Sequence, residues 1–284
     1  MNERPAEREV LHHKVMPEFK GAVAALLREA GVKFILPRFE NLRDADISTK
    51  SSDTDFVTIA DREAEAWLTP RLAGLLPATV VGEEAVSSQQ HPYAFDATGY
   101  SWTVDPLDGT KNFVRGKPAF CCMIALLWAG KAVQSWIWHP LSETLFFAAA
   151  AGGAWRIDSE GAIKITVDRQ PKALEGMIGT GNALGLPEPR RSNLQARLRL
   201  LAGREFNGSA GVQACRIASG QADFMIHGRA TPWDHAPTDL LCREAGGHAA
   251  ALDDEAPFDL NLAAPFMAAS SPTTWAVLRQ AVWD

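Results

Sequence analysis

The 284-residue sequence has few cysteines, and they lack the spacing of a disulfide framework or a zinc site. The four are Cys121, Cys122, Cys215 and Cys242, and no two of them form a CxxC pair. Cys121 and Cys122 are adjacent within an apolar run, which is typical of small buried side chains. We therefore expect no disulfide framework, no zinc site and no catalytic thiol.

The sequence also lacks long hydrophobic runs and an excess of positive charge. Its longest apolar stretches, such as MIALLWAG and LFFAAAAGG, are far shorter than the ~20 residues that a membrane-spanning helix needs. The first residues, MNERPAEREVLHHKVMP, carry charges throughout and contain no signal-peptide core. The net charge of −6 argues against nucleic acid or an anionic membrane as the main partner. We expect a cytoplasmic protein with no membrane partner.

No internal repeat, low-complexity tract or flexible linker divides the chain. With 46% hydrophobic and 22% charged residues, its composition is that of an ordinary globular protein with a sizeable core. We expect a single unit over residues 1–284. A change of composition near Gly152 and Gly153 suggests two approximate sublayers, residues 1–152 and 153–284.

The spacing of apolar residues predicts both helices and strands. Residues 18–30, EFKGAVAALLREA, have helical spacing and precede Gly31, a typical helix stop. FVTIADREAEAWLTPRLAGLL begins with the alternation of a strand and becomes helical after Asp61. The runs AFCCMIALL, AVQSWIW and ETLFFAAA, joined by short links, predict an antiparallel meander. The second half mixes both patterns, so we expect layers of helices and sheets.

The stretch WTVDPLDGTKNF places two acids three residues apart at the end of a hydrophobic run. We expect Asp105 to end a strand and Pro106 to turn the chain, so that Asp105 and Asp108 face one point. Two close carboxylates repel each other unless a cation neutralises them, and oxygen ligands suit Mg2+ or Ca2+ better than Zn2+. The alternative is that Asp105 caps a turn and Asp108 is a solvated turn residue.

Gly109 and Thr110 follow directly and are expected to begin a short helix. Backbone N–H groups at a helix start, unobstructed at glycine, can hold a phosphate that bridges to the same metal ion. The motif therefore suggests that a cation and an anion bind next to each other at this turn.

Two further stretches contain acids where elements begin or end. VVGEEA ends a short strand with Glu83 and Glu84, and TPWDHAPTDLLCREAGG places Asp234 at a helix start. Considered separately, Glu83 and Glu84 are typical of a solvated pair in a loop, and Asp234 is typical of a helix N-cap. Taken with Asp105 and Asp108, they are what a site for several Mg2+ ions requires.

The motifs GEE, DPLDGT and WDHAPTDLLCREAGG, in this order and at these separations, resemble the inositol monophosphatase family of metal-dependent phosphomonoesterases. The resemblance covers nearly the whole chain from about Phe19 onward. It implies an α/β fold built as a five-layer α/β/α/β/α sandwich, dependence on two or three Mg2+ ions, sensitivity to lithium and a homodimer. It also implies a set of metal ligands, namely Glu83, Asp105, the backbone carbonyl of Leu107, Asp108 and Asp234.

The resemblance further implies how water attacks the phosphate. In the family, the threonine of the DGT segment positions the water with help from an upstream aspartate, which here is Asp61 in TIADREAE. Glu83, Thr110 and Asp61 are therefore the expected catalytic residues, with two ions that activate the water and bind the leaving oxygen. The alternative for Asp61 is a helix N-cap, and both readings can hold together.

The expected substrate is a small phosphorylated metabolite. The residues expected to bind it are Asp108, Gly109, Thr110, His227 and Asp234. Inositol-preferring relatives carry an acid seven positions before the WD aspartate, and this chain has His227 there, which puts inositol in doubt. A histidinol-phosphatase or a 3′(2′),5′-bisphosphate nucleotidase activity is the alternative within the family. Nearby Arg229 could contact an anion or simply be solvated.

Two readings of a different class remain open. Fold alone does not determine function, so the chain could be a non-catalytic, regulatory partner protein. The complete set of acids argues against that reading. A structural module stabilised by Ca2+ or Mg2+ would instead bind metal tightly without an open coordination position.

Overall fold

The computed structural model describes residues 5–49, 56–89, 96–167, 172–201, 203–205, 207–258 and 264–284. The helices are α1 (Pro5–His12), α2 (Phe19–Ala30), α3 (Ile59–Leu75), α4 (Glu83–Gln89), α5 (Thr110–Val114), α6 (Arg190–Leu198), α7 (Ala210–Ala218), α8 (Pro232–Glu244) and α9 (Pro272–Val282). The strands are β1 (Ile47–Thr49), β2 (Phe56–Thr58), β3 (Thr79–Gly82), β4 (Tyr100–Asp108), β5 (Cys121–Trp128), β6 (Lys131–His139), β7 (Thr144–Ala149), β8 (Gly153–Asp158), β9 (Gly161–Ile165), β10 (Ile178–Gly181), β11 (Gly203–Glu205), β12 (Phe224–His227), β13 (His248–Ala251) and β14 (Phe266–Ala269).

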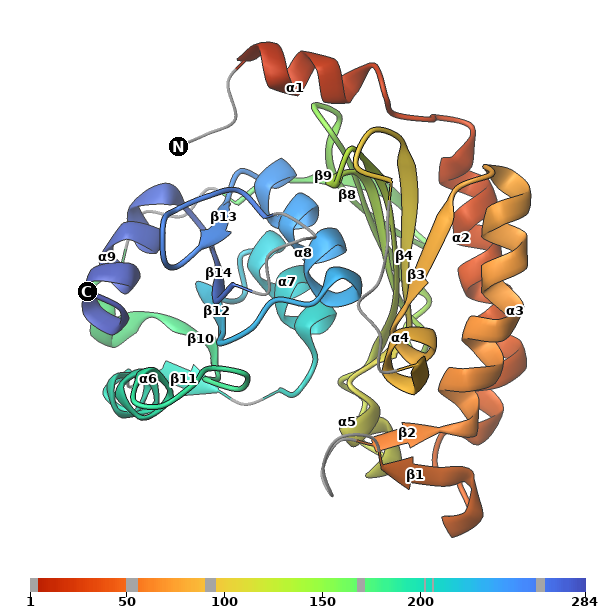
Figure 1. The fold of residues 1–284 in the computed structure, drawn as a ribbon, viewed down its shortest axis with the longest axis horizontal. Coiled ribbons are helices and arrows are strands. Elements are labelled where there is room, and N and C mark those ends of the chain that lie inside the picture. Colours follow the sequence, from red (N-terminus) through yellow and green to blue (C-terminus); the bar gives the residue numbers. More distant parts are fainter. Residues whose placement is uncertain are drawn as a thin grey trace.

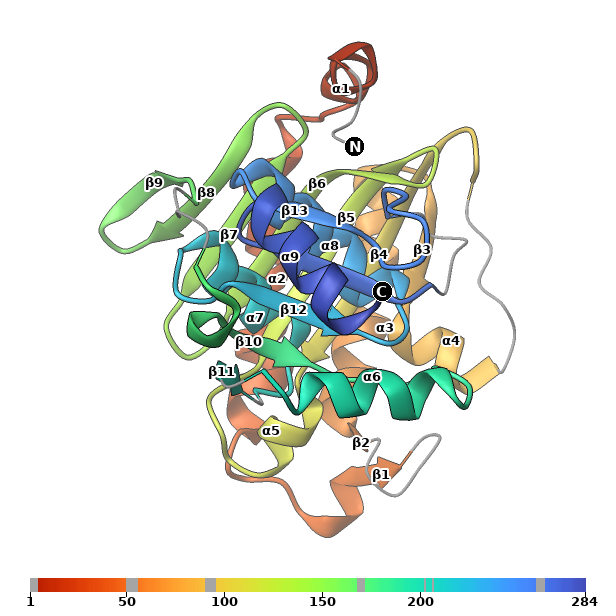
Figure 2. The same ribbon diagram turned by 90° about the vertical axis from the view of Figure 1, so that its left-hand side faces the viewer.

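These elements stack in five layers (Figure 1). Helices α2 and α3 cover one face of a seven-stranded sheet, and α7 and α8 cover its other face. A five-stranded sheet lies beyond α7 and α8, with α6 and α9 on its outer face (Figure 2). The expected α/β/α/β/α sandwich is confirmed. Among the described residues, no helix combines the length and hydropathy that crossing a bilayer requires.

The larger sheet has the strand order β3-β4-β5-β6-β7-β8-β9. Strand β3 pairs parallel with β4, and the other pairs are antiparallel, as expected for a meander. Strands β5 and β6 are buried along nearly their whole length because helices cover both faces, which explains their continuous apolar runs. The fully buried Trp102 and Trp136 lie in this core.

The expected sublayer boundary after residue 152 lies inside this sheet. Strand β8 begins at Gly153 and pairs with β7, and β9 continues the same sheet to Ile165. The shift to the smaller sheet therefore comes only between Ile165 and Ile178. Gly152 and Gly153 belong to a tight connection between neighbouring strands, where Gly153 has φ +81°.

The smaller sheet has the order β11-β10-β12-β14-β13. Strand β10 pairs parallel with β11 and β12, whereas β14 is antiparallel to β12 and β13. Parallel neighbours need a crossover, and α6 supplies it between β10 and β11, whereas α7 connects β11 to β12 on the other side of β10. Strand β12 leads directly into α8, so the end of this sheet lies beside the helix that carries Asp234.

One predicted helix stop is wrong. Helix α2 matches the expected segment, but Gly31 has φ −64° and the chain continues as a π-helix over Gly31–Ile35. A Cβ atom at Gly31 would lie 2.0 Å from the ring of Trp138. The glycine is therefore required for close packing of the helix against β6, and it does not end the helical path.

Candidate active site

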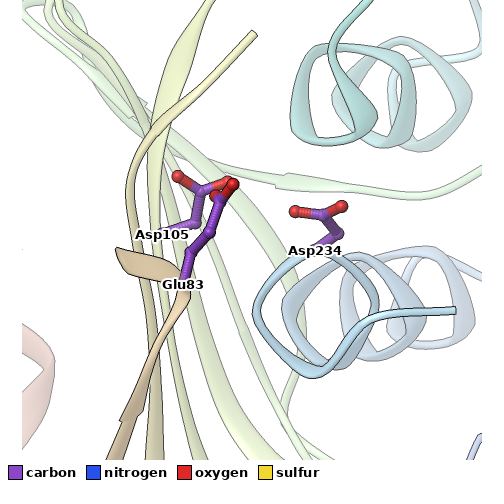
Figure 3. A group of neighbouring side chains, drawn as sticks. All are labelled: Glu83, Asp105 and Asp234. Atoms are coloured by element: carbon purple, nitrogen blue, oxygen red, sulfur yellow. The ribbon is translucent and has the colours of Figure 1, made fainter. Parts of the chain in front are cut away.

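Three acids from three elements converge at one point. Glu83 is the first residue of α4, Asp105 lies in β4, and Asp234 lies in the first turn of α8. The parallel register pairs Gly82 of β3 with Val104 of β4, which places Glu83 next to Asp105. Figure 3 shows these two side chains facing Asp234 across a short gap. One oxygen of each carboxylate lies within 4.8 Å of the others.

Electrostatics within this acidic cluster favour a bound cation. Burial raises the pKa of Asp105 well above its usual range, and the charges of Glu83, Asp108 and Asp234 raise it further. Burial also raises the pKa of Asp234, with Asp108 and Glu83 adding to the effect. Buried carboxylates that disfavour one another's charge are a set of hard oxygen donors, which suits Mg2+. The residues present therefore fit the metal that the sequence predicts.

Asp108 lies near the acidic cluster, but its carboxylate is bound to the start of α7. Its Oδ2 accepts hydrogen bonds from Ser209 Oγ at 2.5 Å and Gly211 N at 2.7 Å, and its Oδ1 accepts one from Ala210 N at 3.2 Å. Burial raises the pKa of Asp108, and these hydrogen bonds oppose that rise. Asp108 thus links β4 to α7, and its role as a metal ligand stays a prediction.

The chain does not turn at Pro106 as expected. Strand β4 continues to Asp108, with an irregular register between Asp105 and Asp108. Proline has no N–H to donate to the neighbouring strand, so it fits at this irregularity, which is a β-bulge. A bulge changes the direction of the side chains beside it, here those of the two aspartates. The backbone N–H of Leu107 donates to Asp105 Oδ1 at 2.9 Å, which orients that carboxylate. The reversal comes at Gly109, where φ is +88°.

The structure brings Thr110 and Asp61 together. Thr110 Oγ1 lies 3.1 Å from Asp61 Oδ1 and 3.0 Å from the carbonyl oxygen of Leu107. Asp61 is buried, and its other oxygen accepts hydrogen bonds from Thr58 N at 2.9 Å and Thr58 Oγ1 at 2.5 Å. Asp61 is therefore held as an acceptor beside the hydroxyl of Thr110. The catalytic roles of both residues stay predictions.

Two helix starts differ from the expected ones. Helix α3 begins at Ile59 rather than after Asp61, because Thr58 is its N-cap and Asp61 completes a capping box at the third position. Helix α8 begins at Pro232 with Thr231 at the N-cap position, so Asp234 is its third residue. Neither aspartate is an N-cap. The Asp234 carboxylate instead lies close to the carboxylates of Glu83 and Asp105.

Sequence reasoning did not identify Glu65, which supports the site from α3. Its carboxylate accepts hydrogen bonds from the backbone N–H groups of Glu84 and Ala85, each at 2.8 Å. A Cβ atom at Gly82 would lie 2.3 Å from the Glu65 carboxyl carbon, so glycine is needed there. Glu65 therefore holds the start of α4, where Glu83 lies. Thr58 was also missed, although T-x-x-D before a helix is a recognisable capping pattern.

The last two residues considered for substrate binding, His227 and Arg229, lie at the end of β12 and just after it. His227 ends β12, is partly exposed, and makes a 2.7 Å hydrogen bond through Nδ1 to Nε2 of His235. Burial lowers the pKa of His227 to about 4, so its ring is neutral near pH 7. Arg229 is exposed on the connection that follows. His227 is thus beside the first turn of α8, and its contact with a substrate stays a prediction.

Comparisons with known proteins agree with this architecture. Residues 18–284 match the model of the inositol monophosphatase family. An inositol-1-monophosphatase of Bacillus subtilis is 31% identical over 234 residues, which cover 81% of this chain and 83% of the relative. A putative Nus factor SuhB of Neisseria meningitidis is 30% identical over 239 residues, covering 82% of this chain and 86% of the relative.

Among solved structures, an IMPase/NADP phosphatase complexed with Mg2+ and phosphate superposes with a TM-score of 0.75. It is 22% identical, and the match covers 93% of this chain and 94% of that one, so it supports the fold. The family model and the curated relatives together establish membership. The chain belongs to the inositol monophosphatase family.

Proposed function

We propose that the protein hydrolyses a small phosphate monoester with Mg2+ held by Glu83, Asp105 and Asp234. The observation that carries the proposal is the convergence of these carboxylates from three separate elements, beside the Asp61–Thr110 pair. Membership of a family of metal-dependent phosphomonoesterases supports the reaction class. The carbonyl of Leu107 and the carboxylate of Asp108 complete the proposed set for two or three ions.

When bound, Mg2+ would lower the pKa of a coordinated water and offset the charge of the phosphate. The chain's own residues then orient the reactants. The hydroxyl hydrogen of Thr110 can be donated to Asp61 Oδ1 or to the Leu107 carbonyl, which leaves the lone pairs of Oγ1 free to accept a hydrogen bond from the attacking water. That contact directs a lone pair of the water oxygen towards phosphorus.

Proton transfer follows from the same contacts. As the water oxygen bonds to phosphorus, its proton passes to Thr110 Oγ1 while the hydroxyl proton of Thr110 passes to Asp61 Oδ1. The Asp61 carboxylate is held for this role because Thr58 donates to its other oxygen. The phosphorus–oxygen bond to the alcohol then breaks, and the alcohol leaves with a proton from solvent.

The test is phosphate release by metal-stripped protein, with and without added Mg2+. The substrates are inositol monophosphate, histidinol phosphate, 3′-phosphoadenosine 5′-phosphate and fructose 1,6-bisphosphate. We expect Mg2+-dependent turnover of at least one compound, and a loss of about 10²- to 10⁴-fold in Asp105→Asn. The exposed Asp44 supplies the matched control, Asp44→Asn, which should keep full activity. Near-normal turnover by Asp105→Asn would exclude the proposed site.

The Neisseria relative supports a second candidate, a regulatory partner protein, because it is named a putative Nus factor. The two candidates give different results in the same assay. A partner protein without catalysis would release no phosphate from any compound, whatever the metal.

Three narrower properties belong to the same proposal, namely inhibition by lithium, a homodimeric state and a cytoplasmic location. Lithium inhibition is measured in the phosphate-release assay. Sedimentation equilibrium of the full chain tests the dimer, and cell fractionation tests the location.

A further inference from the structure

A buried asparagine links the candidate site to the loop that precedes α7. Asn112 lies on α5, two positions after Thr110, and only 8% of its surface is exposed. Its Nδ2 donates to the carbonyl oxygen of Ala119, 2.7 Å away, and to the carbonyl oxygen of Asn207. An amide nitrogen carries two hydrogens, so both are used. Turned over, the amide would place its own oxygen against two carbonyl oxygens, so the contacts determine its orientation.

The loop before α7 approaches Asn112 closely. Residues 207–209 form this loop, called the α7 loop below. Gly208 has a φ of +67°, and a Cβ atom there would lie 3.3 Å from Asn112 Nδ2, so glycine suits both the backbone conformation and the contact. Asn207 Oδ1 accepts a hydrogen bond from Ser209 N at 3.2 Å, which shapes the turn into the helix. Asn112 therefore fixes one side of the α7 loop to α5.

The other side of the α7 loop is fixed to the smaller sheet. Asn207 Nδ2 donates to Gln213 Oε1 at 2.6 Å. Gln213 is fully buried on α7, and its Nε2 donates to the carbonyl oxygen of Phe224, at the start of β12, at 2.9 Å. A row of three amide side chains thus joins α5, α7 and β12. Because a buried polar group that loses its partner is costly, the α7 loop is held in one position.

The α7 loop ends at the residue that binds Asp108. Ser209 Oγ donates to Asp108 Oδ2 at 2.5 Å, and the N–H groups of Ala210 and Gly211 donate to the same carboxylate. The position of the α7 loop therefore decides where these three donors lie. Within the described part of the chain, no hydrogen bond joins Asn112 directly to Asp108. Any influence of Asn112 on that carboxylate passes through the α7 loop.

We propose that Asn112 is a positioning residue, which holds the α7 loop so that Ser209 and the start of α7 keep the Asp108 carboxylate in the orientation needed to bind Mg2+. The inference rests on the Mg2+ site of the proposed function, in which Asp108 is one of the ligands. Partners that orient a metal-binding carboxylate typically contribute about tenfold or more to metal affinity. Removing the Asn112 amide should therefore lower the affinity for Mg2+ although every ligand is retained.

The first test is Mg2+ affinity, measured by calorimetry without substrate. We expect a loss of about tenfold or more in Asn112→Ala and in Ser209→Ala. If both residues act through the same contact with Asp108, the double variant should bind Mg2+ about as weakly as the weaker single variant, whereas independent effects would multiply to about a hundredfold or more. The matched control is Asn41→Ala, because Asn41 also donates to a backbone carbonyl but is exposed. Unchanged affinity in either single variant, or multiplied losses in the double variant, would overturn the proposal.

Urea unfolding in EDTA separates this role from a loss of folding. A folded Asn112→Ala that is less stable but keeps its full Mg2+ affinity would show that Asn112 is only structural. If Asn112→Ala does not fold, Asn207→Ala replaces it in the same cycle, because it removes two side-chain hydrogen bonds from the α7 loop and leaves the Asn112 amide in place. The expected result is the same, a loss of about tenfold that does not multiply with that of Ser209→Ala.

Phosphate release gives a second readout. Turnover that Asn112→Ala loses at low Mg2+ should return towards the level of the unaltered protein at saturating Mg2+, because all ligands are retained. An active unaltered enzyme together with an Asn112→Ala variant that added Mg2+ does not restore would overturn this inference and leave the phosphatase proposal standing. If the unaltered protein hydrolyses none of the substrates, the phosphatase proposal fails, and the Mg2+ titrations still decide this inference.

Discussion

The buried carboxylates of Asp105 and Asp234 lower the stability of the metal-free fold when they are charged. The same two carboxylates are suitable ligands for a cation. Each carboxylate is directed at the other and at Glu83, and burial raises the pKa of both aspartates. A raised pKa means that the folded state disfavours the charged form. The contribution of Asp105 to stability is therefore greatest below the usual carboxyl pKa and is lost as the pH rises through the raised value.

Asp105→Asn should accordingly stabilise the metal-free protein while it abolishes catalysis. Asparagine keeps an oxygen that accepts from Leu107 N and removes the charge. We expect the free energy of unfolding at pH 8 to rise, because the buried charge is removed, and the gain in free energy to be smaller at pH 5. Urea unfolding in EDTA measures both values. A variant that is less stable than the unaltered protein at pH 8 would contradict this assignment.

His139 should make the fold sensitive to acid. Burial lowers its pKa from 6.5 to about 4. A lowered histidine pKa means that its contribution to stability is complete above pH 6.5 and is lost as the pH falls towards 4. Between pH 7 and pH 5 this loss amounts to about 2 kcal/mol. In His139→Gln, urea unfolding should show a pH dependence smaller by that amount, and an identical dependence would show that His139 does not titrate as expected.

At the scale of elements, the site depends on how helix starts are held. Helix α4 begins with Glu83, and the carboxylate of Glu65 on α3 accepts hydrogen bonds from the next two backbone N–H groups. Helix α7 begins at the N-cap Ser209, and Asp108 accepts hydrogen bonds from this end of the helix. In both cases a buried carboxylate satisfies N–H groups that a helix start leaves unpaired.

Glu65→Gln should weaken Mg2+ binding although Glu65 is not a predicted ligand. Glutamine places an N–H donor against one of the two backbone N–H groups, so the start of α4 and the Glu83 carboxylate should shift. We expect Mg2+ affinity, measured by calorimetry, to fall about tenfold or more. The matched control is Glu63→Gln on the same helix, because Glu63 pairs with Arg38 near the surface. Equal affinities for the two variants would remove Glu65 from the site.

At the scale of the whole molecule, the acidic cluster joins two layers. Asp105 belongs to the seven-stranded sheet and Glu83 begins α4 directly after the edge strand β3, whereas Asp234 belongs to α8 in the middle layer. A cation bound between them would hold the layers together. The hydrophobic core that includes Trp102 and Trp136 also extends from the large sheet through α7 and α8.

The chain should therefore unfold in one cooperative transition, as expected for a single unit. Tryptophan fluorescence and far-UV circular dichroism should give the same midpoint in urea, and Mg2+ should raise both midpoints together. At a concentration 100 times its Kd, the ion should add about 2.7 kcal/mol to the free energy of unfolding, with no such gain in Asp105→Asn. Two separate transitions would contradict the prediction of one unit over residues 1–284.

Local patterns in the sequence predicted the features that depend on neighbouring residues. Apolar alternation indicated the meander of β5, β6 and β7, and helical spacing indicated α2. Motif spacing indicated the family and the acids Glu83, Asp105 and Asp234. Periodicity and turn chemistry act over a few residues, so a single sequence displays them.

Contacts between distant segments were decided only by the tertiary structure. Glu65 reaches the start of α4, Asp108 is bound by α7 more than a hundred positions away, and Gly31 is required by the ring of Trp138. His227 forms a hydrogen bond to His235 because the end of β12 lies beside the first turn of α8. The sequence alone determined which chemical groups were available and in which kind of element, because those follow from local preferences. The tertiary structure decided what each group faces, because burial and hydrogen-bond geometry exist only after the layers pack.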